Sequence, residues 1–173
     1  MNLWFALIFS GVISQRLLEL RLAKRNAIRI RGIGGYEIGA DHYKYLVLLH
    51  AAFFLSLLTE FSLRRPFFSL WMLVPSAIFI LLQAARIWCI RSLGIHWNTR
   101  IFIVPGAPLV RRGPYRFLRH PNYAVVTLEL LFLPLIFGCY WSAALFPVLN
   151  MIVLKRRISL EEQALLSMST AAE

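Results

Sequence analysis

The sequence predicts an all-α integral membrane protein with about five transmembrane helices, the last two forming a hairpin. Hydrophobic residues make up 59% of the 173 residues, and the mean hydropathy is +0.65. Soluble domains hold roughly 45–50% apolar residues even when glycine is counted. Here the apolar residues form long blocks, and arginine-rich stretches with glycine and proline separate them. This alternation is typical of a multi-pass membrane protein.

Each of the first three apolar blocks is long enough for one membrane span. They cover residues 3–22, 43–63 and 67–90. A helix rises about 1.5 Å per residue, so ~20 residues cross ~30 Å of hydrocarbon. Within the first block Arg16 and Glu19 share a helix face and could pair or point into a helix bundle. Within the third, Pro75 is expected to kink the helix.

The last apolar block, residues 123–154, is too long for one span and carries Pro134 and Gly138 near its middle. Dividing it into a hairpin gathers three basic clusters on one side of the membrane. These clusters lie in residues 24–44, 91–119 and 155–157. The positive-inside rule therefore predicts an external N-terminus and a cytoplasmic C-terminus, with Arg64 and Arg65 outside. Trp88, Trp97 and Trp141 are expected in the aromatic belts.

The segments between the blocks are expected to be loops. Residues 21–31 form a basic loop, and the glycines of 32–35 form a turn. The polar segment 91–122 is rich in proline, arginine and aromatic residues, which favours a cytoplasmic functional loop over disorder. A short surface helix is expected at 159–167, capped by Ser159.

Several classes of function are disfavoured by composition and spacing. The net charge of +11 would suit nucleic acid, but the arginines lie between apolar blocks rather than on one amphipathic face. The two cysteines and four histidines show no metal-ligand spacing, so no metal is expected. The length predicts a single domain over residues 1–173, with its core at about 70–166.

Three motifs follow one another in the C-terminal half. They are Gly113-Pro114-Tyr115-Arg116, Arg119-His120-Pro121-Asn122-Tyr123 and Arg157-x-x-x-Glu161-Glu162-x-x-Leu165. In this order and spacing they resemble the isoprenylcysteine carboxyl methyltransferase family. The chain looks most similar to a small bacterial branch that methylates alkylpyrone-type products of type III polyketide synthases. That likeness rests on His42-Tyr43-Lys44, Gln83-x-x-Arg86-x-Trp88, Arg91-Ser92-Leu93-Gly94, Trp97-Asn98-Thr99 and Pro105-Gly106.

The resemblance implies O-methylation with S-adenosylmethionine, in the bacterial cytoplasmic membrane, of a lipophilic acceptor that enters from the bilayer. It implies a cofactor site formed by Leu109, Gly113, Tyr115, His120, Pro121, Tyr123, Glu161 and Glu162. Arg119 and Arg157 would face the reacting oxygen. Glu129 is a third catalytic candidate, because a carboxylate inside a span is usually functional. The alternative for Glu129 is a structural pair with Arg86 or Arg16.

The acceptor and the use of a base stay open at this level. A carboxylate or acidic pyrone hydroxyl is already anionic and suits arginine, whereas a phenol needs a base, for which His120 is the first candidate. Prenylated protein C-termini are the alternative acceptor. A steroid-reductase-like enzyme that uses NADPH, and a non-catalytic membrane subunit, are the rival functions.

Overall fold

The computed structural model describes residues 3–67 and 69–170, which are helical apart from one short two-stranded sheet. The chain divides into two compact units. Unit 1 comprises Met1–Tyr43, Leu93–Leu109 and Arg157–Glu173, and unit 2 comprises Lys44–Ser92 and Val110–Arg156. Each unit is described by itself.

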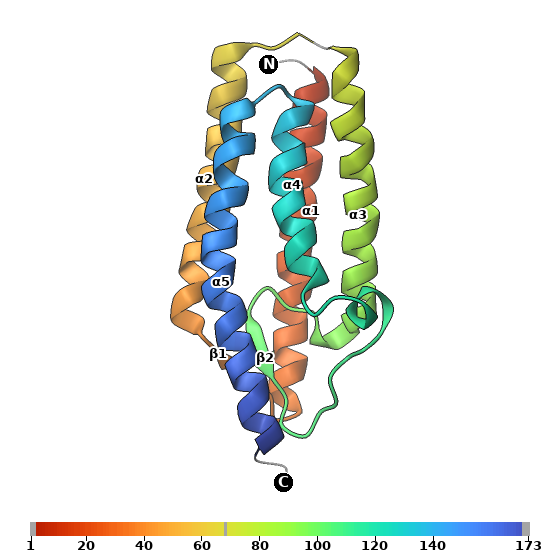
Figure 1. The fold of residues 1–173 in the computed structure, drawn as a ribbon, viewed down its shortest axis with the longest axis vertical. Coiled ribbons are helices and arrows are strands. Elements are labelled where there is room, and N and C mark those ends of the chain that lie inside the picture. The colour runs from red at the N-terminus through yellow and green to blue at the C-terminus, as the bar shows by residue number, and fades with distance from the viewer. Residues whose placement is uncertain (1–2, 68, 171–173) are drawn as a thin grey trace. The chain divides into compact units, whose positions relative to one another are not determined.

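Five long helices account for most of the described chain (Figure 1). They are α1 (Leu3–Gly32), α2 (Ala40–Arg64), α3 (Leu73–Leu93), α4 (Pro121–Ile136) and α5 (Tyr140–Thr170). The strands are β1 (Tyr36–Ile38) and β2 (Ile101–Ile103), and 3-10 turns occupy Leu70–Met72, Gly94–His96 and Gly113–Arg116. Among the described residues, three stretches are long and apolar enough to cross a membrane: Leu3–Gly32, Ala40–Arg64 and Leu70–His96.

Unit 2 is a bundle of the parts of α2, α3, α4 and α5 that belong to it. Within this unit Figure 1 shows α4 and α5 running in opposite directions from the turn that joins them. Phe53 of α2 packs edge-on against Phe146 of α5, with ring centroids 5.3 Å apart. Gly138 lies in the connecting turn with φ +64°, a conformation that glycine adopts without strain. The predicted division of the last apolar block is therefore confirmed.

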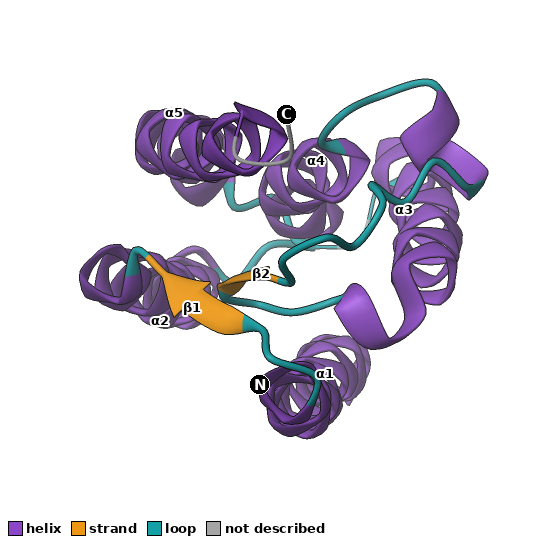
Figure 2. Cartoon of the chain, turned by 90° about the horizontal axis from the view of Figure 1, so that it is seen from below, coloured by secondary structure: helices purple, strands orange, loops and turns teal. Residues whose placement is uncertain are grey.

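Unit 1 joins α1 to the short sheet and to the segment that leads into β2. Strands β1 and β2 pair antiparallel, with Glu37 opposite Phe102 (Figure 2). Glu37 also accepts charged hydrogen bonds from Arg100 at 2.7 Å and Arg31 at 3.1 Å. These ion pairs fix a ribbon that is too short to be stable by backbone pairing alone.

Three local expectations were wrong. Helix α1 continues through the expected basic loop to Gly32, because lysine and arginine are good helix formers and Arg29 and Arg31 suit a helix C-terminus. Likewise α5 runs without a break to Thr170, so Ser159 lies inside a helix and caps nothing. Pro75 lies in the first turn of α3, where its missing N–H costs no hydrogen bond.

The polar segment 91–122 is also more ordered than the sequence suggested. It contains the end of α3, β2 and two of the 3-10 turns. Trp97, expected in an aromatic belt, is only 1% exposed, whereas Trp88 is 51% exposed. Burial of Trp97 anchors the part of this segment that belongs to unit 1, residues 93–109, so the conformation of that part depends on tertiary packing.

Candidate functional site

The 3-10 turn Gly113–Arg116 is seated on the end of α3 within unit 2. Gly113 has φ +54°, and a Cβ there would collide with the side chains of Ser92 and Trp88. Tyr115 packs its ring against the buried cluster that includes Leu82 and Cys89. The glycine is therefore needed twice, for its backbone conformation and for the close approach to α3.

The motif at 119–123 leads into α4, with His120 at the N-cap position. Pro121 is the first helical residue, where its fixed φ favours a helix start. The rings of His120 and Tyr123 stack nearly parallel, with centroids 5.3 Å apart and 11° between their planes. Between them Asn122 carries a buried Oδ1 that has no hydrogen-bond partner among the described residues. The start of α4 thus contains both a stacked aromatic pair and an unsatisfied acceptor.

Two further contacts fix the first turn of α4. Thr127 Oγ1 donates to the carbonyl of Tyr123 at 2.9 Å, and Asn150 Nδ2 of α5 donates to Thr127 Oγ1 at 2.8 Å. Asn150 is fully buried. The chain of bonds runs from α5 to the backbone of a candidate cofactor residue, so packing of the two helices positions that residue.

Both carboxylate oxygens of Glu129 are bound by side chains of α3. Its Oε2 lies 3.0 Å from Arg86 Nη1, and its Oε1 accepts from Gln83 Nε2 at 2.8 Å. Glu129 and Arg86 are 3% and 6% exposed. This is the structural pairing that the sequence offered as the alternative to catalysis. Arg16, the other suggested partner, pairs with Glu19 at 2.9 Å, which confirms the predicted contact within α1.

The arginines of the loop before α4 lie on the surface of unit 2. Arg111, Arg112, Arg116 and Arg119 are all exposed. Exposed guanidinium groups can bind an anion from solvent or from the membrane surface. Arg119 is exposed like its neighbours, and its role at the reacting oxygen stays a prediction.

In unit 1, Arg157 is 5% exposed and donates through Nη2 to the carbonyl of Thr99 at 2.8 Å. The neighbouring Asn98 donates to the carbonyl of Ala23 at 2.9 Å, and Asn26 donates to that of Trp97 at 2.7 Å. The Trp97-Asn98-Thr99 segment is thus held from α1 and from α5, which gives it a structural role.

The other predicted residues of unit 1 lie on α5 and in the loop after β2. Glu161 and Glu162 are half-buried, and Leu109 is exposed. Seven predicted site residues thus lie in unit 2 and four in unit 1. Those in unit 2 are Gly113, Tyr115, Arg119, His120, Pro121, Tyr123 and Glu129.

Two residues outside the predicted set are connected to the candidate residues of unit 2, Asn122 through the chain and Asn150 through its bond to Thr127. Asn122 lies inside the R-H-P-x-Y pattern at its variable position, so only its burial and its missing partner single it out. Asn150 could have been suspected as an amide within an apolar block, because polar side chains in spans usually bond another helix.

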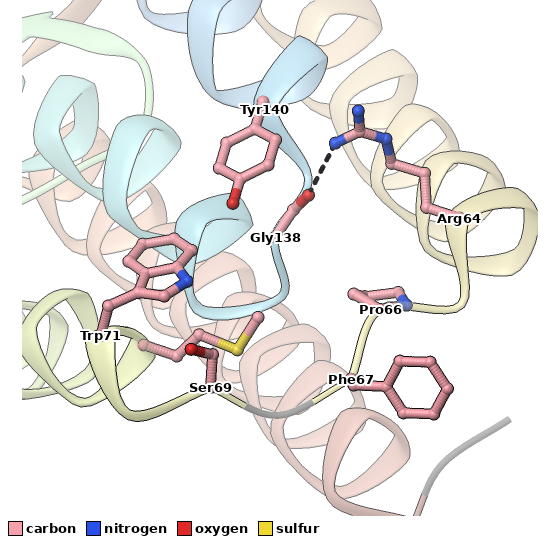
Figure 3. A pocket seen from close by; sticks show the side chains of 8 residues that line it. Arg64, Pro66, Phe67, Ser69, Trp71, Gly138 and Tyr140 are labelled. Carbon is pink, nitrogen blue, oxygen red and sulfur yellow. Dashed lines mark hydrogen bonds between the residues drawn. The ribbon is translucent and has the colours of Figure 1, made fainter.

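A cavity of about 330 Å³ lies elsewhere in unit 2, between the α2–α3 connection and the α4–α5 turn. Its lining includes Arg64, Trp71, Gly138 and Tyr140 (Figure 3). Arg64 donates to the carbonyl of Gly138 at 3.1 Å and lies 5.1 Å from the Tyr140 ring centroid. None of the predicted site residues lines it, so it is distinct from the candidate site.

Comparison with known proteins assigns the chain to a family. The isoprenylcysteine carboxyl methyltransferase (ICMT) family matches residues 71–167. "Uncharacterized protein YpbQ" of Bacillus subtilis (strain 168) is 41% identical over 161 residues, which are 93% of this chain and 96% of that protein.

An "Uncharacterized protein" of Haemophilus influenzae is 24% identical over 164 residues, 94% of this chain and 95% of that one. No solved structure matches. Enzymes of the ICMT family use S-adenosylmethionine as methyl donor. With a matching region that includes the turn at Gly113, the start of α4 and the glutamates of α5, this chain is a membrane protein of the isoprenylcysteine carboxyl methyltransferase family.

Proposed function

We propose that the protein is an integral membrane O-methyltransferase that uses S-adenosylmethionine on a hydrophobic acceptor, an alkylpyrone-type lipid. The observation that carries the proposal is the family match over residues 71–167, which includes all three motifs. The arrangement at the start of α4 supports it, because an aromatic pair and an unsatisfied buried acceptor suit a purine nucleoside with amino groups.

The described residues fit the cofactor. The stacked rings of His120 and Tyr123 offer a face for the adenine, and Asn122 Oδ1 offers an acceptor for an amino group. Carboxylates such as Glu161 and Glu162 suit ribose hydroxyls or an ammonium group, and their assignment rests on the sequence motif alone. When bound, the cofactor supplies an electrophilic methyl group on a sulfonium.

The chain's own task is to position and neutralise the acceptor. Methyl transfer is an in-line displacement, so alignment of the two partners and exclusion of water are the main requirements. The exposed guanidinium of Arg119 can hold an anionic acceptor oxygen through paired N–H groups. The part proposed for Arg157 rests on the motif. An acidic pyrone hydroxyl needs no base, whereas a phenol would draw on His120.

The membrane arrangement that we propose has five spans in one domain, with the N-terminus outside and the C-terminus in the cytoplasm. The three long apolar stretches and the shorter apolar helix Pro121–Ile136 would supply four of these spans. The apolar first part of α5 would supply the fifth. Sixteen residues give α4 a length of about 24 Å, which is shorter than the ~30 Å of hydrocarbon. It would therefore cross the membrane only if the polar residues that flank it reach the two interfaces. The charge distribution supports the orientation.

A transfer assay in lipid nanodiscs tests the proposal. Protein with labelled S-adenosylmethionine is given a long-chain alkylpyrone or a farnesylated cysteine peptide, and the methylated product is identified by mass spectrometry. We expect methyl transfer to the alkylpyrone oxygen and loss of transfer in His120→Ala. Absence of transfer to both acceptors by folded protein would refute the methyltransferase proposal.

The family description favours one second candidate, carboxyl methylation of prenylated C-termini. Transfer to the farnesylated peptide alone would support that candidate. A thermal-shift measurement with each cofactor distinguishes a methyltransferase from an NADPH-dependent reductase, because a ligand that binds only folded protein raises the melting temperature. We expect stabilisation by S-adenosylmethionine or its demethylated product, and none by NADPH.

A further inference from the structure

The loop before α4 carries an exposed apolar pair that the proposed methyl transfer does not use. Phe117 is 76% exposed and Leu118 is 57% exposed. Arg111, Arg112 and Arg116 precede them, and all three are exposed. The guanidinium of Arg116 lies over the Phe117 ring, 6.0 Å from its centroid. Large apolar side chains in an exposed cationic loop need a partner that offers both hydrocarbon and negative charge.

The loop contacts the final turns of α3, and this contact fixes its position within unit 2. Gly113 approaches Trp88 and Ser92 so closely that a Cβ would not fit. Trp88 lies five residues before the end of α3 and is 51% exposed. Exposed tryptophan near the end of an apolar helix is typical of the boundary between headgroups and acyl chains. Phe117 and Leu118 follow in the chain only a few residues after this contact, which keeps them near that boundary.

The charge of unit 2 indicates that the binding partner of the loop is negatively charged. Its sequence contains only two carboxylates, Glu60 and Glu129, and both are buried. All of its exposed ionisable side chains that keep a charge at neutral pH are therefore basic. Arginines beside an apolar pair, at the end of membrane-spanning helices, match the phosphates and acyl chains of anionic phospholipids. A nucleic acid would match the arginines but not the apolar pair.

We propose that residues 111–119 form a lipid-binding element. Phe117 and Leu118 insert at the headgroup–acyl boundary, and Arg111, Arg112 and Arg116 bind the phosphates of anionic phospholipids. Because the segment runs directly into the His120–Tyr123 motif, the bilayer surface would fix the start of that motif. This proposal goes beyond methyl transfer and stands on the exposure and charge of the loop.

A fluorescent label at position 118 tests the lipid-binding element. In Leu118→Cys the new thiol is accessible, whereas the native Cys89 and Cys139 are buried. The nitrobenzoxadiazole label is measured in vesicles of phosphatidylcholine, with and without phosphatidylglycerol. We expect blue-shifted emission and several-fold weaker quenching by iodide when phosphatidylglycerol is present. High salt should reverse much of the change, because surface charges are screened.

Matched variants show which side chains cause the change. Arg111→Gln with Arg112→Gln should abolish the response to phosphatidylglycerol, whereas Lys155→Gln with Arg156→Gln, an exposed basic pair on α5, should preserve it. A label at Leu81→Cys, which is 69% exposed on α3, gives the reference for hydrocarbon in both lipids.

Two results would overturn the proposal: a label at 118 that reports water in both lipids, or equal emission with and without phosphatidylglycerol. Equal loss of the response in both pairs of charge variants would also overturn it, because the attraction would then not belong to the loop. The measurement involves no methyl transfer, so its outcome is separate from that of the proposed function.

Discussion

Arg86 Nη1 of α3 lies 3.0 Å from Glu129 Oε2 of α4, and both side chains are buried in the interior of unit 2. Gln83 supplies a second hydrogen bond to the other carboxylate oxygen. A buried pair in an apolar bundle is tolerated when both partners are satisfied, and it fixes how two helices meet. Glu129, predicted as a catalytic candidate, therefore has a structural partner that accounts for a carboxylate in the apolar helix α4.

Separating this pair should be costly. Glu129→Leu leaves the Arg86 guanidinium buried without its counter-charge, and loss of one partner costs about 3–5 kcal/mol. We expect a lower melting temperature in detergent for Glu129→Leu, and recovery of most of it in the double variant Arg86→Met with Glu129→Leu. If the double variant is stable but inactive in methyl transfer, Glu129 or Arg86 has a catalytic part as well.

The carboxylate of Glu60 should stabilise the start of α5. It accepts from the backbone N–H groups of Trp141 at 3.0 Å and Ser142 at 2.9 Å, which have no partner within their own helix. Glu60→Ala leaves these donors unsatisfied, which costs about 1–3 kcal/mol. Thr59→Ala, which loses only a bond to Leu55 within α2, is the control and should change stability by less than about 0.5 kcal/mol. Equal melting temperatures for the two variants would contradict the capping role.

Gly113 and Gly106 form a natural comparison. Both have positive φ, but a Cβ at Gly106 would meet nothing within 4 Å, whereas one at Gly113 would collide with Ser92 and Trp88. Gly106→Ala should cost only the backbone strain of about 1–2 kcal/mol. We expect a larger loss of melting temperature for Gly113→Ala and partial recovery when Ser92→Ala removes the nearest atom. Equal losses at both positions would show that the turn is not seated on α3.

Asn122 should contribute to cofactor affinity under the proposed function. Removal of one neutral hydrogen bond costs about 0.5–1.5 kcal/mol, so Asn122→Ala should weaken S-adenosylmethionine binding about 2–10-fold in a calorimetric titration. Ser76→Ala, which loses only the bond from Ser76 Oγ to the carbonyl of Met72 in the turn before α3, serves as the control and should bind normally. Unchanged affinity in Asn122→Ala would remove this residue from the cofactor site.

Cys139, in the turn between α4 and α5, should make stability depend on alkaline pH. Burial, aided by the nearby Glu60 carboxylate, raises the pKa of its thiol from 9.0 to about 12. The folded state therefore holds the proton more tightly, and its advantage is complete below pH 9 and is lost as pH rises towards about 12. The stability difference between wild type and Cys139→Ala should shrink over this range in thermal melts. A constant difference would contradict the raised pKa.

Much of the architecture follows from the chain read locally. The apolar blocks predict the long helices, because a span needs a continuous run of apolar residues whatever its neighbours are. Gly138 marks the division of the last block, and Arg16 pairs with Glu19 because residues three apart share a helix face. The helix ends were less predictable, since basic residues are as compatible with a helix as with a loop.

Only the tertiary structure shows which residues far apart in sequence form hydrogen bonds or ion pairs with one another. Sequence allowed Glu129 to pair with Arg86 or Arg16, and only packing of α4 on α3 selects Arg86, 43 residues away. The contacts of Glu60 with Ser142 and of Arg157 with Thr99 join residues 82 and 58 positions apart, and no local pattern marks either. A periodic pattern records which face of a helix is apolar, but the side chain that satisfies a buried charge depends on which helices pack together. The sequence by itself therefore determined the membrane class and the position of the motifs, while the fold decided which charged residues are buried in structural pairs and which stay exposed.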